Sequence, residues 1–93
     1  YVYFLVEQLT RTAENLGCSA GQAKLMVTET FAGSMELLQS SGEDPAELRR
    51  RVTSPHGTTE RAIAALAAAA LSGLLDRATA AALARARELA AGA

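Results

Sequence analysis

Apolar residues recur at intervals of three and four along almost the whole chain, and this spacing constrains the fold more than any other feature. Such a period places the apolar side chains on one face of an α-helix. Alternating β-branched or aromatic runs, which indicate strands, do not occur. A chain of 93 residues has the length of one domain. The sequence therefore predicts an all-α fold, a single helical-bundle domain of about five helices.

The first two helices are delimited by recognisable start and stop signals. The first is expected over about residues 1–16, and Gly17 closes it as a C-cap glycine. The second begins at Ser19, and Gln22 stands three residues later, which is the spacing of a capping box. We expect this helix to run to about residue 39 or 40, ahead of Gly42.

The third helix is short and is expected over about residues 44–52. Asp44, Pro45 and Glu47 supply a cap, a first-turn proline and an acid in the order typical of a helix start. Arginines 49–51 fall in its last turn, where cations stabilise the helix dipole; contact with a phosphate or carboxylate is the functional alternative. The last two helices are rich in alanine and are expected at about 59–70 and 72–90.

The second helix carries an apolar face too wide for contact with one neighbour. The face consists of Ala23, Met26, Val27, Thr30, Phe31, Ser34, Met35 and Leu38. It predicts the central and most buried helix, and Gly33 within it predicts close approach by another helix. A single chain would leave on the order of several hundred Å² of apolar surface exposed. Pairing of two copies about a two-fold axis is the usual remedy.

One loop, residues 52–59, combines hydroxyl groups, a proline and a glycine at the start of a helix. Pro55 interrupts the helix before it, and Gly57 permits a left-handed or close-packed backbone. Thr58 or Thr59 is expected to cap the helix that follows. The unpaired N–H groups of a helix start, together with these hydroxyls, predict a small site for an anion such as a carboxylate. A plain connector between helices is the alternative.

Composition argues against several classes of partner. Nine basic and ten acidic residues nearly balance, so no nucleic-acid partner is expected. Cys18 is the single cysteine, which fits a reducing, cytoplasmic compartment, and with one histidine it makes no zinc site, so no metal is expected. The longest uncharged run, residues 62–75, is too short to span a bilayer, and no membrane partner is expected. Because Tyr1 opens a helix without a cap, we expect a piece of a longer protein.

Motifs for other chemistries are missing or weak. Neither Gly-x-Gly-x-x-Gly nor a Walker loop is present, so we expect no cofactor-binding residues in this chain. Asp44, Ser54 and His56 contain the groups of a catalytic triad, but no nucleophile-elbow pattern surrounds the serine. His56 is interpreted as an exposed loop residue, and a donor or cation beside a bound anion is the alternative.

The loop sequence Val-Thr-Ser-Pro-His-Gly-Thr-Thr, residues 52–59, resembles the Val-Thr-Ser-Pro-Gly-Gly-Thr-Thr signature of pyrroline-5-carboxylate reductases. Residues 41–49 are similar to the family's Ser-Gly-Glu-His-Pro-Ala-Glu-Leu-Arg segment. The first and last helices also resemble those of the family, through Tyr1, Val2, Glu7, Leu9, Thr10, Leu16 and Gly17 and through Arg85, Arg87, Glu88 and Leu89. The resemblance thus extends over nearly the whole chain.

The resemblance implies that residues 1–93 are the C-terminal helical dimerisation and substrate-binding domain of a two-domain enzyme. Its N-terminal Rossmann domain, absent from this chain, would bind NADPH or NADH. The full-length enzyme would reduce the small molecule 1-pyrroline-5-carboxylate to L-proline, whereas this chain alone would be inactive. The helical domain would interlock with a second copy as a two-fold homodimer, and a larger oligomer is left open.

Carried over residue by residue, the resemblance implies that the Ser54 hydroxyl and the backbone N–H groups of Gly57 and Thr58 bind the substrate carboxylate. Thr59 would lie at the ring nitrogen, as a hydrogen-bond partner and candidate proton donor. Because an alcohol is a weak acid, a relay through water is equally open.

Two departures from the family pattern fall where the family has glycine. His56 stands where the signature has glycine, and histidine fits poorly if that position requires positive φ. We expect His56 to be tolerated at the rim, with the carboxylate site preserved. Ala70 stands where the family often has glycine, and alanine there favours straightened or merged fourth and fifth helices.

Two other functions remain open at this point. One is a purely structural helical oligomerisation domain of a related reductase, without a retained substrate site. The other is the helical domain of a different imine or hydroxyacid reductase, against which the loop signature argues. Activity of the full-length protein with NADPH, and its loss on changing Ser54 or Thr59 to alanine, would distinguish the enzyme domain from the structural one.

Overall fold

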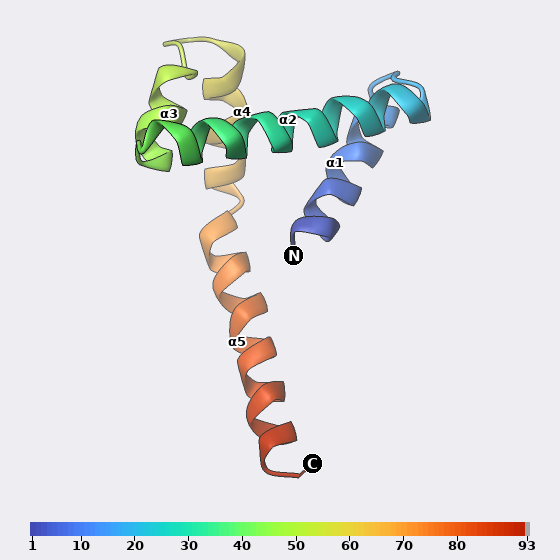
Figure 1. Cartoon of the computed structure of the whole chain (residues 1–93), viewed down its shortest axis with the longest axis vertical. Coiled ribbons are helices and arrows are strands. Elements are labelled where there is room, and N and C mark those ends of the chain that lie inside the picture. The colour runs from blue at the N-terminus through green and yellow to red at the C-terminus, as the bar shows by residue number, and fades with distance from the viewer. Residues whose placement is uncertain (93) are drawn as a thin grey trace. The chain divides into compact units, whose positions relative to one another are not determined.

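A computed structural model describes residues 1–92, which form helices joined by turns (Figure 1). No strand occurs in this described part, so the prediction of an all-α chain of about five helices is confirmed. The chain divides into two compact units, Tyr1–Leu48 and the part from Arg49 onward. In chain order the helices are α1 (Val2–Asn15), α2 (Ala20–Ser41), α3 (Pro45–Arg51), α4 (Thr58–Ala68) and α5 (Leu71–Ala90).

Helix α1 ends in a glycine motif that the sequence predicts. The N–H of Gly17 donates to the carbonyl of Glu14 at 3.0 Å, and the N–H of Cys18 donates to that of Ala13 at 3.1 Å. This pair of bonds is a Schellman motif. Gly17 has a φ of 112°, which glycine adopts without the steric cost of a Cβ atom. The C-cap role predicted for Gly17 is confirmed.

Helix α2 begins with the predicted capping box. The Ser19 hydroxyl accepts the N–H of Gln22 at 3.2 Å, and the Gln22 side chain accepts the N–H of Ser19 at 3.0 Å. The helix ends at Gly42, which takes the left-handed conformation. Both ends of α2 are therefore specified by residues next to them in the sequence.

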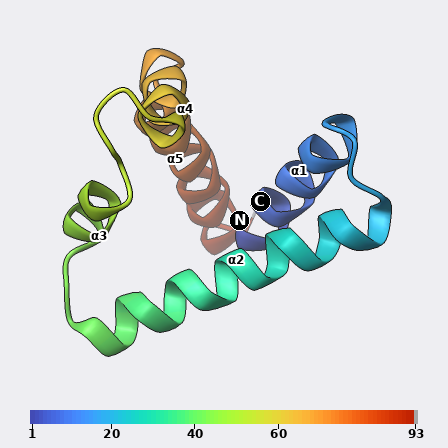
Figure 2. The ribbon, with the colours of Figure 1, turned by 90° about the horizontal axis from the view of Figure 1, so that it is seen from above.

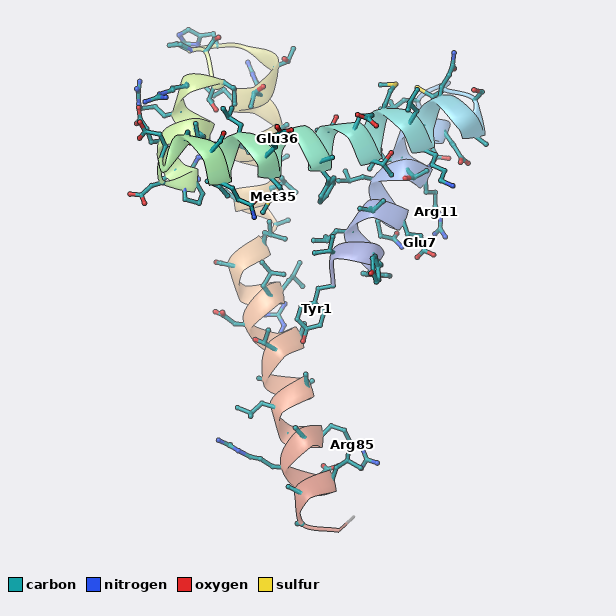
Figure 3. The ribbon with its side chains drawn as sticks, viewed as in Figure 1. Tyr1, Glu7, Arg11, Met35, Glu36 and Arg85 are labelled. Atoms are coloured by element: carbon teal, nitrogen blue, oxygen red, sulfur yellow. The ribbon has the colours of Figure 1, made fainter. Side chains whose placement is uncertain are left out.

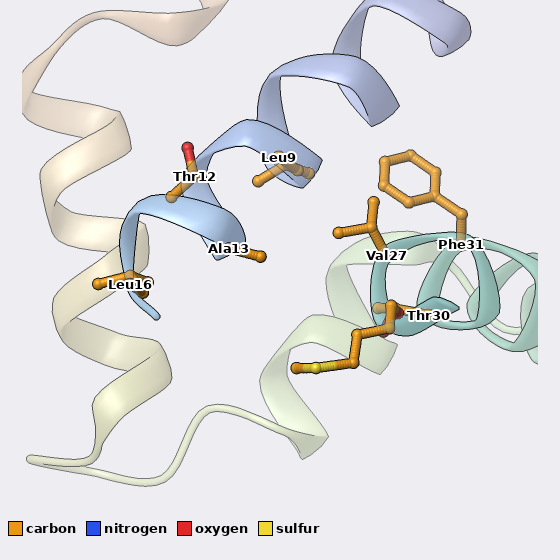
Figure 4. A pocket seen from close by; sticks show the side chains of 8 residues that line it. Leu9, Thr12, Ala13, Leu16, Val27, Thr30 and Phe31 are labelled. Carbon is orange, nitrogen blue, oxygen red and sulfur yellow. The ribbon is translucent and has the colours of Figure 1, made fainter. Parts of the chain in front are cut away.

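Helix α1 folds back beside the N-terminal half of α2, as Figures 1 and 2 both show. A hollow of about 280 Å³ lies between the two helices, and its walls are almost entirely apolar. Figure 4 shows Val27 and Phe31 of α2 pointing toward Leu9 and Ala13 of α1 across this hollow. The two helices thus contact each other without filling the space between them.

The sequence predicts α2 as the central and most buried helix, and a single chain meets this prediction only in part. Ala23 of α2 is completely buried, but Leu25, Met26, Met35 and Leu37 expose half or more of their surface. The accessible surface is 7556 Å². Two separate compact units sharing the chain's 9.7 kDa would expose about 6,200 Å². Part of the apolar face of α2, including Met26 and Met35, is therefore exposed in the described residues, although α1 lies beside its N-terminal half.

The close approach predicted at Gly33 is not found within one chain. A Cβ atom added to this glycine would meet nothing within 4 Å. A glycine inside a helix costs about 1 kcal/mol relative to alanine. The described residues thus show no close contact at Gly33 that would require a glycine.

Helices α4 and α5 remain separate, and the axes of the two helices differ by 49°. Ala70, between them, is left-handed with φ of 56° and ψ of 51°. Its N–H donates to the carbonyl of Ala67 at 3.0 Å, and its carbonyl accepts the N–H of Leu74 at 3.1 Å. The expectation that alanine in place of glycine straightens or merges the helices is wrong. Alanine adopts the left-handed conformation because hydrogen bonds on both sides hold the break.

Helix α5 presents mostly exposed side chains. Arg85, labelled in Figure 3, forms an exposed ion pair with Glu88 at 2.9 Å, one turn further along the helix. Among residues 1–92, no single helix has the length and hydropathy to cross a bilayer, although α4 and α5 taken together across their bend do.

Replacing Ala70 by glycine should raise the free energy of unfolding by about 1 kcal/mol, because glycine adopts positive φ without a steric penalty. Ala69, whose φ is −80°, is the matched control. Ala69→Gly should lower the free energy of unfolding by up to about 1 kcal/mol, through the entropy that glycine gains in the unfolded chain. Urea unfolding followed by circular dichroism at one protein concentration measures both changes. Equal effects of the two substitutions would contradict strain at Ala70.

Candidate functional site

A tight turn at Ser54–Gly57 leads into α4. The N–H of Gly57 donates to the carbonyl of Ser54 at 3.0 Å, which closes a four-residue β-turn. Pro55 occupies the second position of this turn, and His56 occupies the third with a φ of 62°. A proline followed by a residue at positive φ is the arrangement of a type II turn. The turn separates α3 from α4.

His56 and Ala70 are the two non-glycine residues with positive φ among residues 1–92. They are also the two positions at which the resemblance to the reductases implies glycine and this chain has another residue. The position of His56 therefore has positive φ, which is the case in which histidine fits less well than glycine. Each residue adopts a backbone conformation that glycine would adopt at lower cost.

Helix α4 begins one residue earlier than expected, and Gly57 is its N-cap. Gly57 is extended, with φ of −86° and ψ of −179°, and no side chain caps the helix by a hydrogen bond. The capping role predicted for Thr58 or Thr59 is therefore wrong. Because the turn is closed at the N–H of Gly57, the helix starts directly after this residue. Both threonines then lie inside the first helical turn, past the capping position.

Gly57 is required because the backbone of Ser54 lies close to it, and not because of its φ, which any residue can adopt. A Cβ atom at this position would lie 3.1 Å from the carbonyl oxygen of Ser54 and 3.3 Å from its Cβ atom. The resemblance assigns the N–H of Gly57 to the substrate carboxylate, whereas here this N–H donates to Ser54. The glycine thus shapes the turn that positions its neighbours.

Several polar groups at the start of α4 have no hydrogen-bond partner within residues 1–92. They are the N–H groups of Thr58 and Thr59 and the hydroxyls of Ser54, Thr58 and Thr59. The Thr53 hydroxyl differs, because it donates to the carbonyl of Arg49. N–H groups at a helix start point out of the helix at the positive end of its dipole. Together with the hydroxyls they can bind a small carboxylate.

The predicted site residues lie within one turn and the first helical turn after it. Ser54 and Thr58 are exposed, as is His56, whereas Gly57 and Thr59 are half-buried. The structure therefore brings Ser54, Thr58 and Thr59 together on one short segment that solvent can reach.

Glu60 is a residue of this segment that the sequence analysis missed. Its carboxylate accepts the N–H of His56 at 2.9 Å. With Gly57 as N-cap, Glu60 is the third residue of α4, where an acid reaches back to the chain before the helix. Glu60 stands three residues after Gly57, which is the spacing of a capping box. This spacing was missed because the sequence predicted the cap at Thr58 or Thr59 instead.

Other kinds of site are not formed by residues 1–92. No group of three or more His, Cys, Asp and Glu side chains in this part lies close enough to hold a metal ion. The described residues also lack the strands from which a dinucleotide-binding βαβ unit is built. A dinucleotide-binding unit of this kind is therefore not formed by residues 1–92.

Comparison with known proteins decides the family. The family model for pyrroline-5-carboxylate reductase dimerisation matches residues 1–89. The chain belongs to the pyrroline-5-carboxylate reductase dimerisation family. This membership confirms the resemblance that the loop at residues 52–59 indicates.

Relatives of this dimerisation domain align over nearly all of it. It is 42% identical over 90 residues to the pyrroline-5-carboxylate reductase of Pseudomonas aeruginosa, covering 97% of this chain and 33% of the relative. It is 35% identical over 89 residues to the pyrroline-5-carboxylate reductase of Corynebacterium melassecola, covering 96% of this chain and 33% of the relative. Identity to pyrroline-5-carboxylate reductase 3 of Danio rerio is 37% over 89 residues, covering 96% and 31%. The chain thus spans about a third of the length of these relatives.

In this dimerisation domain, Gly57→Ala should lower the free energy of unfolding by about 1–3 kcal/mol, because the new Cβ atom would crowd the Ser54 carbonyl. Gly21→Ala is the control, since a Cβ atom there meets nothing within 4 Å. This change should be neutral or stabilising, because alanine favours a helix. Chemical unfolding measures both variants. A Gly57→Ala protein as stable as the parent would contradict the close approach.

Proposed function

We propose that this chain is the substrate-binding and dimerising part of a pyrroline-5-carboxylate reductase. The whole enzyme would reduce 1-pyrroline-5-carboxylate to L-proline with NADPH or NADH in the cytoplasm. The observation that carries this proposal is the set of unpaired N–H and hydroxyl groups at the start of α4. Membership of the family and the names of the relatives support the reaction.

The roles of the residues follow from the shape of the substrate, a small ring with one carboxylate and one imine nitrogen. The Ser54 hydroxyl and the N–H of Thr58 would bind the carboxylate, and Gly57 would hold the turn that aims them. Thr59, one residue further into the helix, would face the ring nitrogen. Reduction adds a hydride to the imine carbon and a proton to this nitrogen. Thr59 would supply the proton directly or through a water molecule.

The exposed loop supplies one wall of such a site. Because residues 1–92 form no βαβ unit, we propose that an N-terminal Rossmann domain in the remainder of the enzyme binds the cofactor and covers the loop. When bound there, the reduced nicotinamide supplies the hydride. Residues 1–93 would then form the C-terminal domain, inactive by itself.

We also propose that two copies of this chain pair as a homodimer through α2. Part of the apolar face of α2 forms a second hollow of about 250 Å³, lined by Thr30, Phe31, Ser34 and Met35. Met35 is half exposed, and Figure 3 shows it projecting from a different side of α2 than Glu36. The description of the family as a dimerisation domain supports the pairing. A partner helix beside Gly33 would also account for the glycine in that helix.

In the full-length protein that contains this chain, Ser54→Ala should raise KM for 1-pyrroline-5-carboxylate about tenfold or more. The change removes a hydrogen bond to a charged group, which contributes about 1.5–3 kcal/mol. Thr59→Ala should lower kcat about 100-fold, which is the lower end of the contribution that a positioned proton donor makes. Thr59→Ser keeps the hydroxyl and should retain most of the parent's kcat. Steady-state kinetics with NADPH measures both constants.

Thr53→Ala is the control within the same loop, because the Thr53 hydroxyl already donates to the carbonyl of Arg49. Its kinetic constants should stay within about twofold of the parent. Unchanged kinetics for both Ser54→Ala and Thr59→Ala would favour the alternative, a purely structural oligomerisation domain.

For the homodimer, Met35→Glu should raise the dissociation constant at least about tenfold, because pairing would bury an unpaired charge. Gln39→Glu adds the same charge at an exposed polar position of α2 and should leave the dimer intact. Sedimentation equilibrium of the isolated chain at micromolar concentration measures both. A parent chain that is monomeric at this concentration would rule out pairing through α2.

A further inference from the structure

The turn before α4 is held by two hydrogen bonds from consecutive amides. The N–H of His56 donates to the Glu60 carboxylate at 2.9 Å, and the N–H of Gly57 donates to the Ser54 carbonyl at 3.0 Å. The second bond closes the turn itself. The first links the turn to the first turn of α4. Together they set the direction in which the neighbouring amides and hydroxyls face.

Histidine at the third position of this turn needs an additional contact. The φ of His56 is 62°, a region that residues with a Cβ atom enter at a steric cost. Gly57, the N-cap, has no side chain with which to hold the turn. The Glu60 carboxylate bonds directly to the residue in the unfavourable conformation, and a hydrogen bond to a charged acceptor is stronger than one to a neutral acceptor. Glu60 therefore offsets the cost of histidine at this position.

We propose that Glu60 is a positioning residue for the substrate carboxylate. By holding His56 in its left-handed conformation, Glu60 orients the N–H groups of Thr58 and Thr59 and the Ser54 hydroxyl. The inference rests on the proposed function, since it takes this loop as the carboxylate site. Glu60 does not touch the substrate, because two carboxylates repel each other. Its bond to His56 keeps its charge directed at the protein's own amide.

Steady-state kinetics of the full-length protein that contains this chain tests the role. Glu60→Ala removes the acceptor and should raise KM for 1-pyrroline-5-carboxylate about 3- to 10-fold, with kcat within about twofold. Glu60→Gln keeps an oxygen acceptor without the charge and should bring KM back to within about twofold of the parent. An equal rise in KM for the alanine and glutamine variants would overturn the proposal, because an oxygen acceptor for the His56 N–H would then not restore the site.

A double-mutant cycle with His56→Gly tests whether Glu60 changes KM through the conformation of the turn. Glycine adopts the left-handed conformation without strain, so the turn needs Glu60 less. In the His56→Gly protein, Glu60→Ala should raise KM by less than about twofold. An equal rise in KM on Glu60→Ala in the parent and in the His56→Gly protein would overturn the proposal. A general loss of folding would not produce this difference between the backgrounds.

Ser54→Ala in the same protein separates this inference from the proposed function. A rise in KM for Ser54→Ala without one for Glu60→Ala would show that the loop binds substrate and that Glu60 does not position it. No change in KM for either variant would overturn the proposed carboxylate site as well. Should Glu60→Ala fail to fold, Glu60→Asp replaces it, because the shorter side chain keeps the charge and should raise KM in the same way.

Discussion

The hydrogen bond from the N–H of Gly57 to the carbonyl of Ser54 decides where α4 begins, and the candidate site depends on that starting point. It makes Gly57 the N-cap and places Thr58 and Thr59 in the first helical turn. Their N–H groups are then unpaired because no carbonyl precedes them in helical register. A start one residue later would have made Thr58 the N-cap, and its hydroxyl would then accept an N–H of the first helical turn. One hydroxyl and one N–H of the candidate site would then be paired within the chain.

His56 and Ala70, the two residues that stand where the resemblance to the reductases implies glycine, both adopt positive φ. At Ala70 the backbone bonds to Ala67 and Leu74 hold the break between α4 and α5. At His56 a backbone bond closes the turn, and the Glu60 side chain adds a second bond from the helix. Both residues thus adopt a backbone conformation that glycine would adopt more easily. Surrounding hydrogen bonds, rather than the local residue, maintain the conformation in both places.

The helices could be predicted closely from the sequence because their limits depend on near neighbours. The capping box of Ser19 and Gln22 and the glycine stop at Gly17 are examples. The start of α4 could not be predicted in this way, because a turn hydrogen bond and not a threonine side chain sets it. The burial of α2 was overestimated, because the sequence pattern shows which side chains are apolar but not what packs against them; Met26 and Met35 are half exposed. The roles proposed for Ser54 and Thr59 came from the resemblance, because hydroxyls at a helix start do not by themselves specify a substrate.

A structure of the full-length protein with L-proline bound would test the central claim most directly. The account predicts the proline carboxylate within hydrogen-bond distance of the Ser54 hydroxyl and the N–H of Thr58, with the ring nitrogen facing Thr59. It also predicts that the bonds from Gly57 to Ser54 and from His56 to Glu60 persist in the complex. Proline bound away from this turn, with the N–H groups of Thr58 and Thr59 bonded to the protein's own atoms, would contradict the account.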